Sequence, residues 1–144
     1  MTNTSLAQSY LTKARHRLKV LDVLMADGAF SDVVREAQEV VELALKGMLR
    51  EVGVEPPKWH DVGQLLQEHS GRLPPQILPD LPALVGASAW LRKEREFSFY
   101  GDIDFIPTER YSRDDAERAM SAAQSAVKAA SAVIRPAEDP LPGR

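Results

Sequence analysis

The chain has 144 residues, no cysteine and a formal net charge of −3, and 44% of its residues are hydrophobic. This length gives one domain with a real core, and the absence of cysteine excludes disulfides, thiolate chemistry and any zinc site built on thiolates. The slight negative charge disfavours dominant, nonspecific binding to nucleic acid. No apolar stretch is long enough to span a bilayer, and the N-terminus lacks the apolar core of a signal peptide, so we expect a cytoplasmic protein without a membrane partner.

Two long amphipathic helices are predicted in the first third of the chain. Apolar residues recur in alternating steps of four and three over 5–27, which indicates a helix that Gly28 can end in a left-handed conformation. Ser31 is the candidate N-cap of the second helix, and the glycine and prolines of 53–57 end it. Because this second helix is apolar on more than one side, we expect it to be central and to touch several neighbours.

The middle of the chain predicts one short and one long helix. Asp61, followed by Gln64, has the spacing of a capping box for the short helix. The stretch 71–82 is too rich in proline for a helix interior. Asp80 can cap a fourth helix, whose last part is the charged segment 92–96.

The last third predicts a loop and a final helix. Residues 97–111 show no helical period and contain several turn residues, so we expect an ordered loop. Ser112 is the candidate N-cap of the last, alanine-rich helix. The predicted fold is therefore all-α, an up-and-down bundle of four main helices and one short helix. It forms a single domain over 1–135, and we expect a disordered tail over 136–144.

Three stretches, taken in order and with their spacing, carry a family resemblance. The first is EAQEVVELALKGMLREVG at 36–53, which contains E-x-x-x-K at 42–46, and the second is the His–Asp pair at 60–61. The third is SFYGD at 98–102, followed by YSRDDAERA at 111–119. Together they resemble the HEPN domain family over most of the chain. The resemblance implies a helical bundle, a homodimer, and a link to nucleotides, RNA or a separate minimal nucleotidyltransferase, commonly within a toxin–antitoxin system.

One departure from the family pattern bears on catalysis. HEPN proteins that resemble metal-independent ribonucleases carry an arginine followed, after four to six residues, by a histidine, and no Arg–His pair here has that spacing. The nearest analogue is Arg95 followed by Tyr100. A neutral imidazole can shuttle a proton near pH 7, whereas a phenol titrates near roughly 10. The sequence therefore favours a protein that is not an enzyme; the ribonuclease alternative would use Arg95 and Tyr100, with His60 as base.

Several side chains are candidates for a ligand site, and each has a structural alternative. The candidate ligand-binding residues are Glu42, Lys46, His60, Arg95, Tyr100 and Tyr111. Glu42 and Lys46 lie one helical turn apart, so they form either a solvent-facing ion pair or the wall of a polar cleft. His60 either packs beside its aromatic neighbour or binds a phosphate at the start of the following helix. The aromatic residues of 97–111 either stack on bases or dock onto the bundle or a second subunit.

Three functions remain open at this point. The first is a non-catalytic module that binds a nucleotide, RNA or a partner nucleotidyltransferase; the second is a divergent ribonuclease; the third is a purely structural, dimerising bundle. No metal and no cofactor are predicted. A group of cations from Lys13 to Lys19 could join those at 92–95 in a phosphate-binding patch, provided that the first and fourth helices pack side by side.

Overall fold

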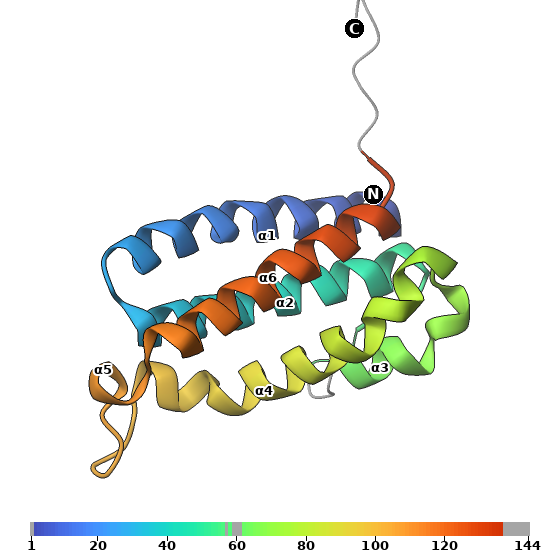
Figure 1. The fold of residues 1–144 in the computed structure, drawn as a ribbon. Coiled ribbons are helices and arrows are strands. Elements are labelled where there is room, and N and C mark those ends of the chain that lie inside the picture. The colour runs from blue at the N-terminus through green and yellow to red at the C-terminus, as the bar shows by residue number, and fades with distance from the viewer. Residues whose placement is uncertain (1, 57, 59–61, 137–144) are drawn as a thin grey trace, which may run out of the picture.

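The computed structural model describes residues 2–56, 58 and 62–136, and these fold into a helical bundle without strands (Figure 1). The elements are α1 (Asn3–Ala26), α2 (Phe30–Glu51), α3 (Val62–Glu68), the 3-10 helices η1 (Ser70–Arg72) and η2 (Pro75–Asp80), α4 (Leu81–Phe99), α5 (Pro107–Arg110) and α6 (Arg113–Val133). The predicted all-α bundle of four main helices is confirmed. Within the described ranges no helix is long and apolar enough to cross a membrane.

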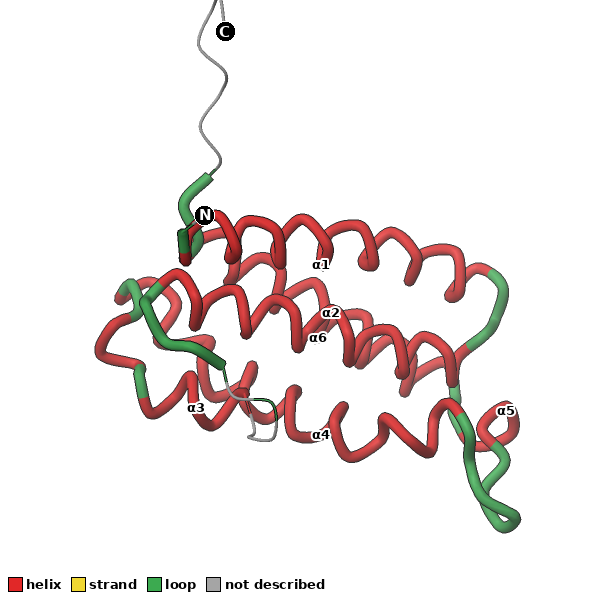
Figure 2. The backbone as a smooth tube through the Cα atoms, turned by 180° about the vertical axis from the view of Figure 1, so that it is seen from behind, coloured by secondary structure: helices red, strands yellow, loops and turns green. Residues whose placement is uncertain are grey.

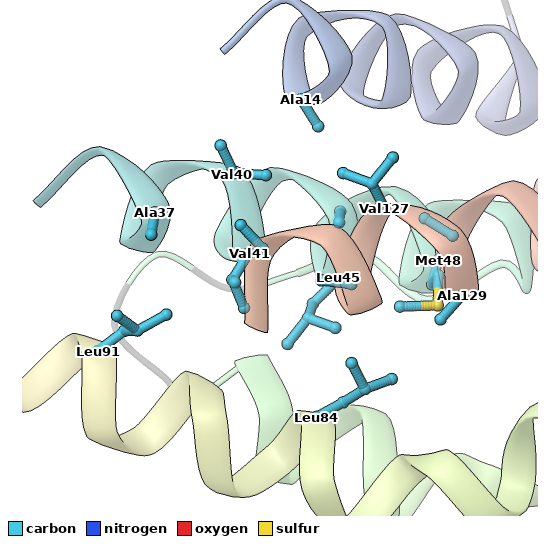
Figure 3. Close-up of a cluster of buried hydrophobic side chains, with 14 of the residues drawn as sticks. Ala14, Ala37, Val40, Val41, Leu45, Met48, Leu84, Leu91, Val127 and Ala129 are labelled. Carbon is cyan, nitrogen blue, oxygen red and sulfur yellow. The ribbon is translucent and has the colours of Figure 1, made fainter. Parts of the chain in front are cut away.

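Helix α2 is the centre of the bundle and packs against α1, α4 and α6. Figure 3 shows Val40 of α2 on the side of Ala14 of α1, and Leu45 on the side of Leu84 of α4. All four side chains are buried, and each buried valine or leucine stabilises the fold by about 1.5–3 kcal/mol relative to an exposed one. The prediction of a central second helix is therefore confirmed.

The turn between α1 and α2 matches the sequence pattern in one residue and departs from it in another. Gly28 adopts the predicted left-handed conformation, with φ +73°. Ser31, however, is not the N-cap: α2 already begins at Phe30, and Ala29 occupies the cap position without a side-chain hydrogen bond. The reason is packing, because Ser31 is buried in the first turn and Phe30 packs against the core.

The proline-rich segment and the start of α4 form continuous helical structure. The six-residue 3-10 helix η2 contains Pro75 and Pro79 and runs directly into α4, so Asp80 is the last residue of η2. The tight 3-10 turn tolerates these prolines because they replace donors that such a short helix does not need. The predicted capping box of α3 depends on Asp61, which lies outside the described residues, as does the predicted tail beyond Pro136.

The prediction of a loop over 97–111 is wrong for 97–99, which belong to α4, and for 107–110, which form α5. Helix α4 continues to Phe99, because Ser98 is buried on the same side as Leu91 and donates a hydrogen bond to the Arg95 carbonyl oxygen at 3.0 Å. Helix α5 adds one turn before α6. Tertiary packing thus extends α4 beyond the charged segment 92–96, where the sequence pattern alone predicts that the helix ends.

The N-terminus of α6 is capped as predicted. The Ser112 hydroxyl accepts a hydrogen bond from the Asp115 backbone N–H at 3.2 Å, and the Asp115 carboxylate accepts one from the Ser112 backbone N–H at 2.9 Å. This reciprocal pair is a capping box, and it fixes the point at which the chain turns from α5 into α6. Figure 2 shows the bundle from behind, with the connection through α5 at one end of α4 and α6.

Candidate functional site

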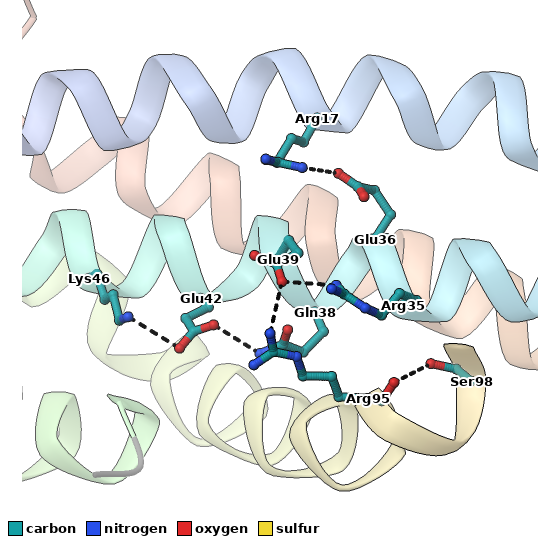
Figure 4. A network of polar contacts seen from close by, with 9 residues as sticks. All are labelled: Arg17, Arg35, Glu36, Gln38, Glu39, Glu42, Lys46, Arg95 and Ser98. Atoms are coloured by element: carbon teal, nitrogen blue, oxygen red, sulfur yellow. Dashed lines mark hydrogen bonds and ion pairs between the residues drawn. The ribbon is translucent and has the colours of Figure 1, made fainter. Parts of the chain in front are cut away.

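A row of polar side chains on α2 faces α4 (Figure 4). Lys46 Nζ lies 3.3 Å from Glu42 Oε1, so the predicted pair forms within the helix. Gln38 donates a hydrogen bond from Nε2 to Glu42 Oε2 at 3.1 Å. Both members of the ion pair are partly buried, so they do not lie in open solvent. Such a pair contributes only about 0.3–0.5 kcal/mol to stability.

Beside this row lies a small cavity with an unused acceptor. Gln38 is 5% exposed, and its Oε1 has no hydrogen-bond partner within the part of the chain that the structure describes. The cavity has a volume of about 10 Å³ and is lined by Glu42, Ser88 and Arg92, among others. This space holds about one water-sized group. Because an unsatisfied buried acceptor costs about 1–3 kcal/mol, Gln38 Oε1 marks a point where a donor from solvent or ligand can bind.

A second cluster joins arginines to exposed aromatic rings. The Glu39 carboxylate accepts a hydrogen bond from Arg35 at 2.9 Å and pairs with Arg95 of α4 at 3.5 Å. The Arg35 guanidinium lies 5.4 Å from the centre of the Phe99 ring, whose edge contact with Tyr100 has a centroid distance of 4.7 Å. Tyr100 is 78% exposed. We call the surface formed by Arg35, Arg95, Phe99 and Tyr100 the arginine–aromatic face.

Tyr111 lies on the other flank of α4. Its side chain is only 8% exposed, and its hydroxyl donates a hydrogen bond to Glu94 Oε2 at 2.7 Å. Burial raises the pKa of the Tyr111 phenol, and the hydrogen bond to the Glu94 carboxylate raises it further. Since successive helical residues are rotated by about 100°, Glu94 points almost opposite to Phe99. The structure therefore separates Tyr111 from the arginine–aromatic face.

Comparison with known proteins places the bundle in a family. The family model of the HEPN domain matches residues 7–133. The chain belongs to the HEPN domain family. The HEPN fold is shared with the crystal structure of TT1696 from Thermus thermophilus, at 26% identity and a TM-score of 0.70 over 87% of this chain and 95% of that one. It is also shared with ST0689, an archaeal HEPN homologue, at 21% identity and a TM-score of 0.68 over 90% and 98% of the two chains. No curated protein matches the sequence significantly.

The HEPN bundle brings four of the six candidate residues to one face. Glu42 and Lys46 of α2 lie on the side of that helix that faces α4, and Arg95 and Tyr100 lie at the end of α4 (Figure 4). His60 lies outside the described residues. The cation patch across the first and fourth helices does not form, because α2 and α6 lie between α1 and α4 (Figure 1).

Three residues on the side of α2 that faces α4 were not predicted as ligand contacts. Arg35 and Glu39 belong to the polar stripe of α2, whose spacing of four predicts an exposed pair but not the arginine that reaches them from α4. Gln38 is a polar residue on the buried apolar side of α2, four residues after Val34 and three before Val41. A polar residue at such a position is the signal that could have identified it, since buried polar groups normally find partners.

Proposed function

We propose that this HEPN protein binds single-stranded RNA, or a nucleotide with the same chemistry, on the arginine–aromatic face and does not cleave it. The observation that carries the proposal is the contact of Arg35 with Phe99, next to the exposed ring of Tyr100 and the guanidinium of Arg95. Rings that face solvent offer stacking surfaces for bases, and arginines beside them can neutralise phosphates.

The arginines of this face differ in how firmly they are held. Arg35 is about three-quarters buried and makes a short 2.9 Å bond to Glu39, so it orients the Phe99 ring. Arg95 is half-exposed and lies at a longer distance of 3.5 Å from the same carboxylate. Because this second ion pair is long and solvated, a phosphate can draw Arg95 away from Glu39 at little cost. Arg92, one turn before Arg95 and exposed, supplies a second phosphate contact.

The charge of the protein limits what kind of binding is possible. The net charge of −3 and the acidic residues of α2 prevent a broad electrostatic attraction to RNA. Binding must therefore depend on stacking and on two phosphate contacts, those of Arg92 and Arg95. For single strands the logarithm of the affinity then falls with the logarithm of salt concentration with a slope of about −1.4.

The absence of cleavage rests on the residues that occupy the family's catalytic positions. Tyr100 takes the place in which the ribonucleases of the family carry histidine, and Arg95 is paired with Glu39. Arg95 supplies a cation and Tyr100 supplies a stacking surface, but neither residue supplies an imidazole that could accept a proton. A partner nucleotidyltransferase and a toxin–antitoxin role, which the family implies, belong to this proposal as biological setting. The binding experiments described below distinguish the docking of a nucleotidyltransferase from the binding of RNA.

Fluorescence anisotropy with short labelled poly(U) and poly(A) strands tests the proposal. Tyr100→Ala should weaken binding by about tenfold, since stacking contributes about 1–3 kcal/mol per base. Arg95→Ala should also weaken binding and make it less dependent on salt. Lys13→Ala, which removes an exposed cation from α1, is the matched control and should bind like the wild type.

Two results would contradict the proposal. Wild-type protein that binds neither RNA strand nor any nucleotide in a thermal-shift assay has no ligand site of this kind. If that protein instead binds a nucleotidyltransferase, and the Arg95→Ala variant does not, the arginine–aromatic face is a protein-docking surface. RNA that is cut in the presence of chelator, and spared by Tyr100→Phe, would establish the ribonuclease in place of the binding module.

A further inference from the structure

The small cavity between α2, α3 and α4 is built around the free oxygen of a buried glutamine. Gln38 lines this cavity, and its Nε2 donates a hydrogen bond to Glu42 Oε2 at 3.1 Å. This bond fixes the orientation of the amide, because exchanging its nitrogen and oxygen would set two acceptors against each other. Gln38 Oε1 has no hydrogen-bond partner among the residues that the structure describes. A donor that enters the cavity would satisfy this oxygen.

The other polar walls of the cavity divide into an acceptor side and a donor side. On α2, the Glu42 carboxylate already contacts Gln38 and Lys46, but an ionised carboxylate has about four acceptor sites and can take a further hydrogen bond (Figure 4). On α4, Ser88 and Arg92 line the cavity one turn apart, and a hydroxyl and a guanidinium can both donate. Ser88 is buried and Arg92 is exposed, so the cavity lies between the core and solvent.

The size of the cavity restricts the chemical group that can enter it. A volume of about 10 Å³ holds one water-sized group. An exocyclic amino group is a single heavy atom with two N–H donors, so it fits this volume and can donate to both Gln38 and Glu42. A carbonyl oxygen has a similar size, but it would meet two acceptors and leave them unpaired. The cavity therefore selects an amino group and leaves the ring that carries it at the mouth.

We propose that this cavity, the Gln38 pocket, recognises the amino edge of adenine or cytosine in the bound strand, an inference that rests on the proposed RNA binding. Both bases carry an amino group next to a ring nitrogen that accepts a hydrogen bond, whereas uracil and guanine present a carbonyl oxygen in the place of the amino group. The amino group donates to Gln38 and Glu42, and the ring nitrogen accepts from Ser88. Glutamine commonly pairs with adenine through both atoms of its amide. Here Glu42 occupies the amide nitrogen, so α4 supplies the donor.

The Gln38 pocket and the arginine–aromatic face lie within reach of one short strand. From Arg92 at the pocket to Phe99 at the end of α4 is about 10 Å along the helix axis. Successive nucleotides of a stacked strand are about 3.4 Å apart, so the pocket lies about three nucleotides from the exposed rings. Arg95 lies between the two on α4 and can contact an intervening phosphate. One strand can therefore stack on Tyr100 and place a base edge at Gln38.

Two pairs of short labelled RNA strands, compared by fluorescence anisotropy, test the proposal. Oligoadenylate is compared with a strand of purine ribonucleotides, which lack the amino group, and oligocytidylate is compared with oligouridylate. The rings within each pair stack alike, so a difference in affinity reports the base edge rather than stacking. The wild type should bind the adenine and cytosine strands about tenfold tighter than their counterparts. Gln38→Met should bring both affinity ratios close to one, and Ser88→Ala should lower them.

The matched control is Gln124→Met, because Gln124 is exposed on α6, away from the cavity. This variant should keep both affinity ratios, and thermal melting verifies that each variant is folded. The comparison of strands on the wild type needs no variant, so it is decisive even where Gln38→Met fails to fold.

Three results would overturn the Gln38 pocket, and they separate its failure from that of RNA binding. Equal affinities within both pairs would remove the pocket and leave RNA binding in place. Affinity ratios that a folded Gln38→Met protein preserves would remove Gln38 as the residue that recognises the base. A wild type that binds none of the four strands would overturn the proposed RNA binding, and the pocket with it.

Discussion

Replacing Tyr111 by phenylalanine decides whether this buried tyrosine supports the fold or a ligand. The substitution keeps the ring, whose centre lies 5.7 Å from that of Phe105, and removes only the hydroxyl that donates to Glu94 at 2.7 Å. Hydrogen bonds to charged groups contribute about 1.5–3 kcal/mol to stability. For a domain of about this size each kcal/mol corresponds to roughly 2–4 °C. The expected decrease in the melting temperature is therefore about 3–12 °C.

Calorimetry at pH 7 measures this change directly. Tyr100→Phe is the matched control, because its hydroxyl is on a side chain that is 78% exposed and its loss should change the free energy of unfolding by less than about 0.5 kcal/mol. Tyr111→Phe should bind RNA as tightly as the wild type. A Tyr111→Phe protein as stable as the wild type, or one with weakened RNA binding, would refute the structural role.

The pH dependence of the same variant has a definite sign. Burial raises the pKa of Tyr111 in the folded state above the value of about 10 that a tyrosine has when unfolded. Below pH 10 the phenol is protonated in both states, so its full contribution to stability is present. Above pH 10 the unfolded state loses the proton first, and stability falls as pH rises. The stability difference between wild type and Tyr111→Phe should therefore shrink above pH 10; a constant difference would contradict the assignment.

Substitutions at three further positions test the structural account. Gly101→Ala should cost at least about 1–2 kcal/mol from the positive φ alone, and should accelerate hydrogen exchange at the amides of the hairpin over 101–106, which two backbone hydrogen bonds close; unchanged exchange would contradict the tight turn. Leu45→Ala, at the centre of the core, should lower the free energy of unfolding in urea by about 2–5 kcal/mol, whereas a loss below about 1 kcal/mol would contradict the central position of α2. Ser112→Ala should cost about 0.5–2 kcal/mol, and Ser112→Asp should restore most of it; equal stability of all three proteins would remove the capping box.

Much of the fold could be predicted from local patterns. The heptad-like spacing of α1, the two apolar sides of α2 and the Ser112 cap are all encoded within a few residues of where they act. Ser31 shows the limit of this reasoning, because burying Phe30 in the core outweighs a good N-cap one residue later. The end of α4 shows the same limit. The charged segment 92–96 predicts the end of the helix, yet α4 continues past it because Ser98 is buried on the core side.

The candidate site was only partly predictable because its contacts join distant residues. Glu42 and Lys46 could be paired from their spacing within one helix. The meeting of Arg95 with Glu39 depends on how α4 lies against α2, which no local pattern specifies. The separation of Tyr111 from Tyr100, which are close in sequence, likewise follows from the rotation of α4 and from the hairpin between them.

The claim that the α2–α4 side of the bundle binds RNA is tested most directly by nuclear magnetic resonance. A titration of isotope-labelled protein with single-stranded RNA reports where each backbone amide changes its environment. The account predicts that the amide shifts concentrate at Arg35, Glu39, Arg95, Phe99 and Tyr100. Shifts that concentrate instead around Tyr111 and Glu94, or an unchanged spectrum at saturating RNA, would contradict it.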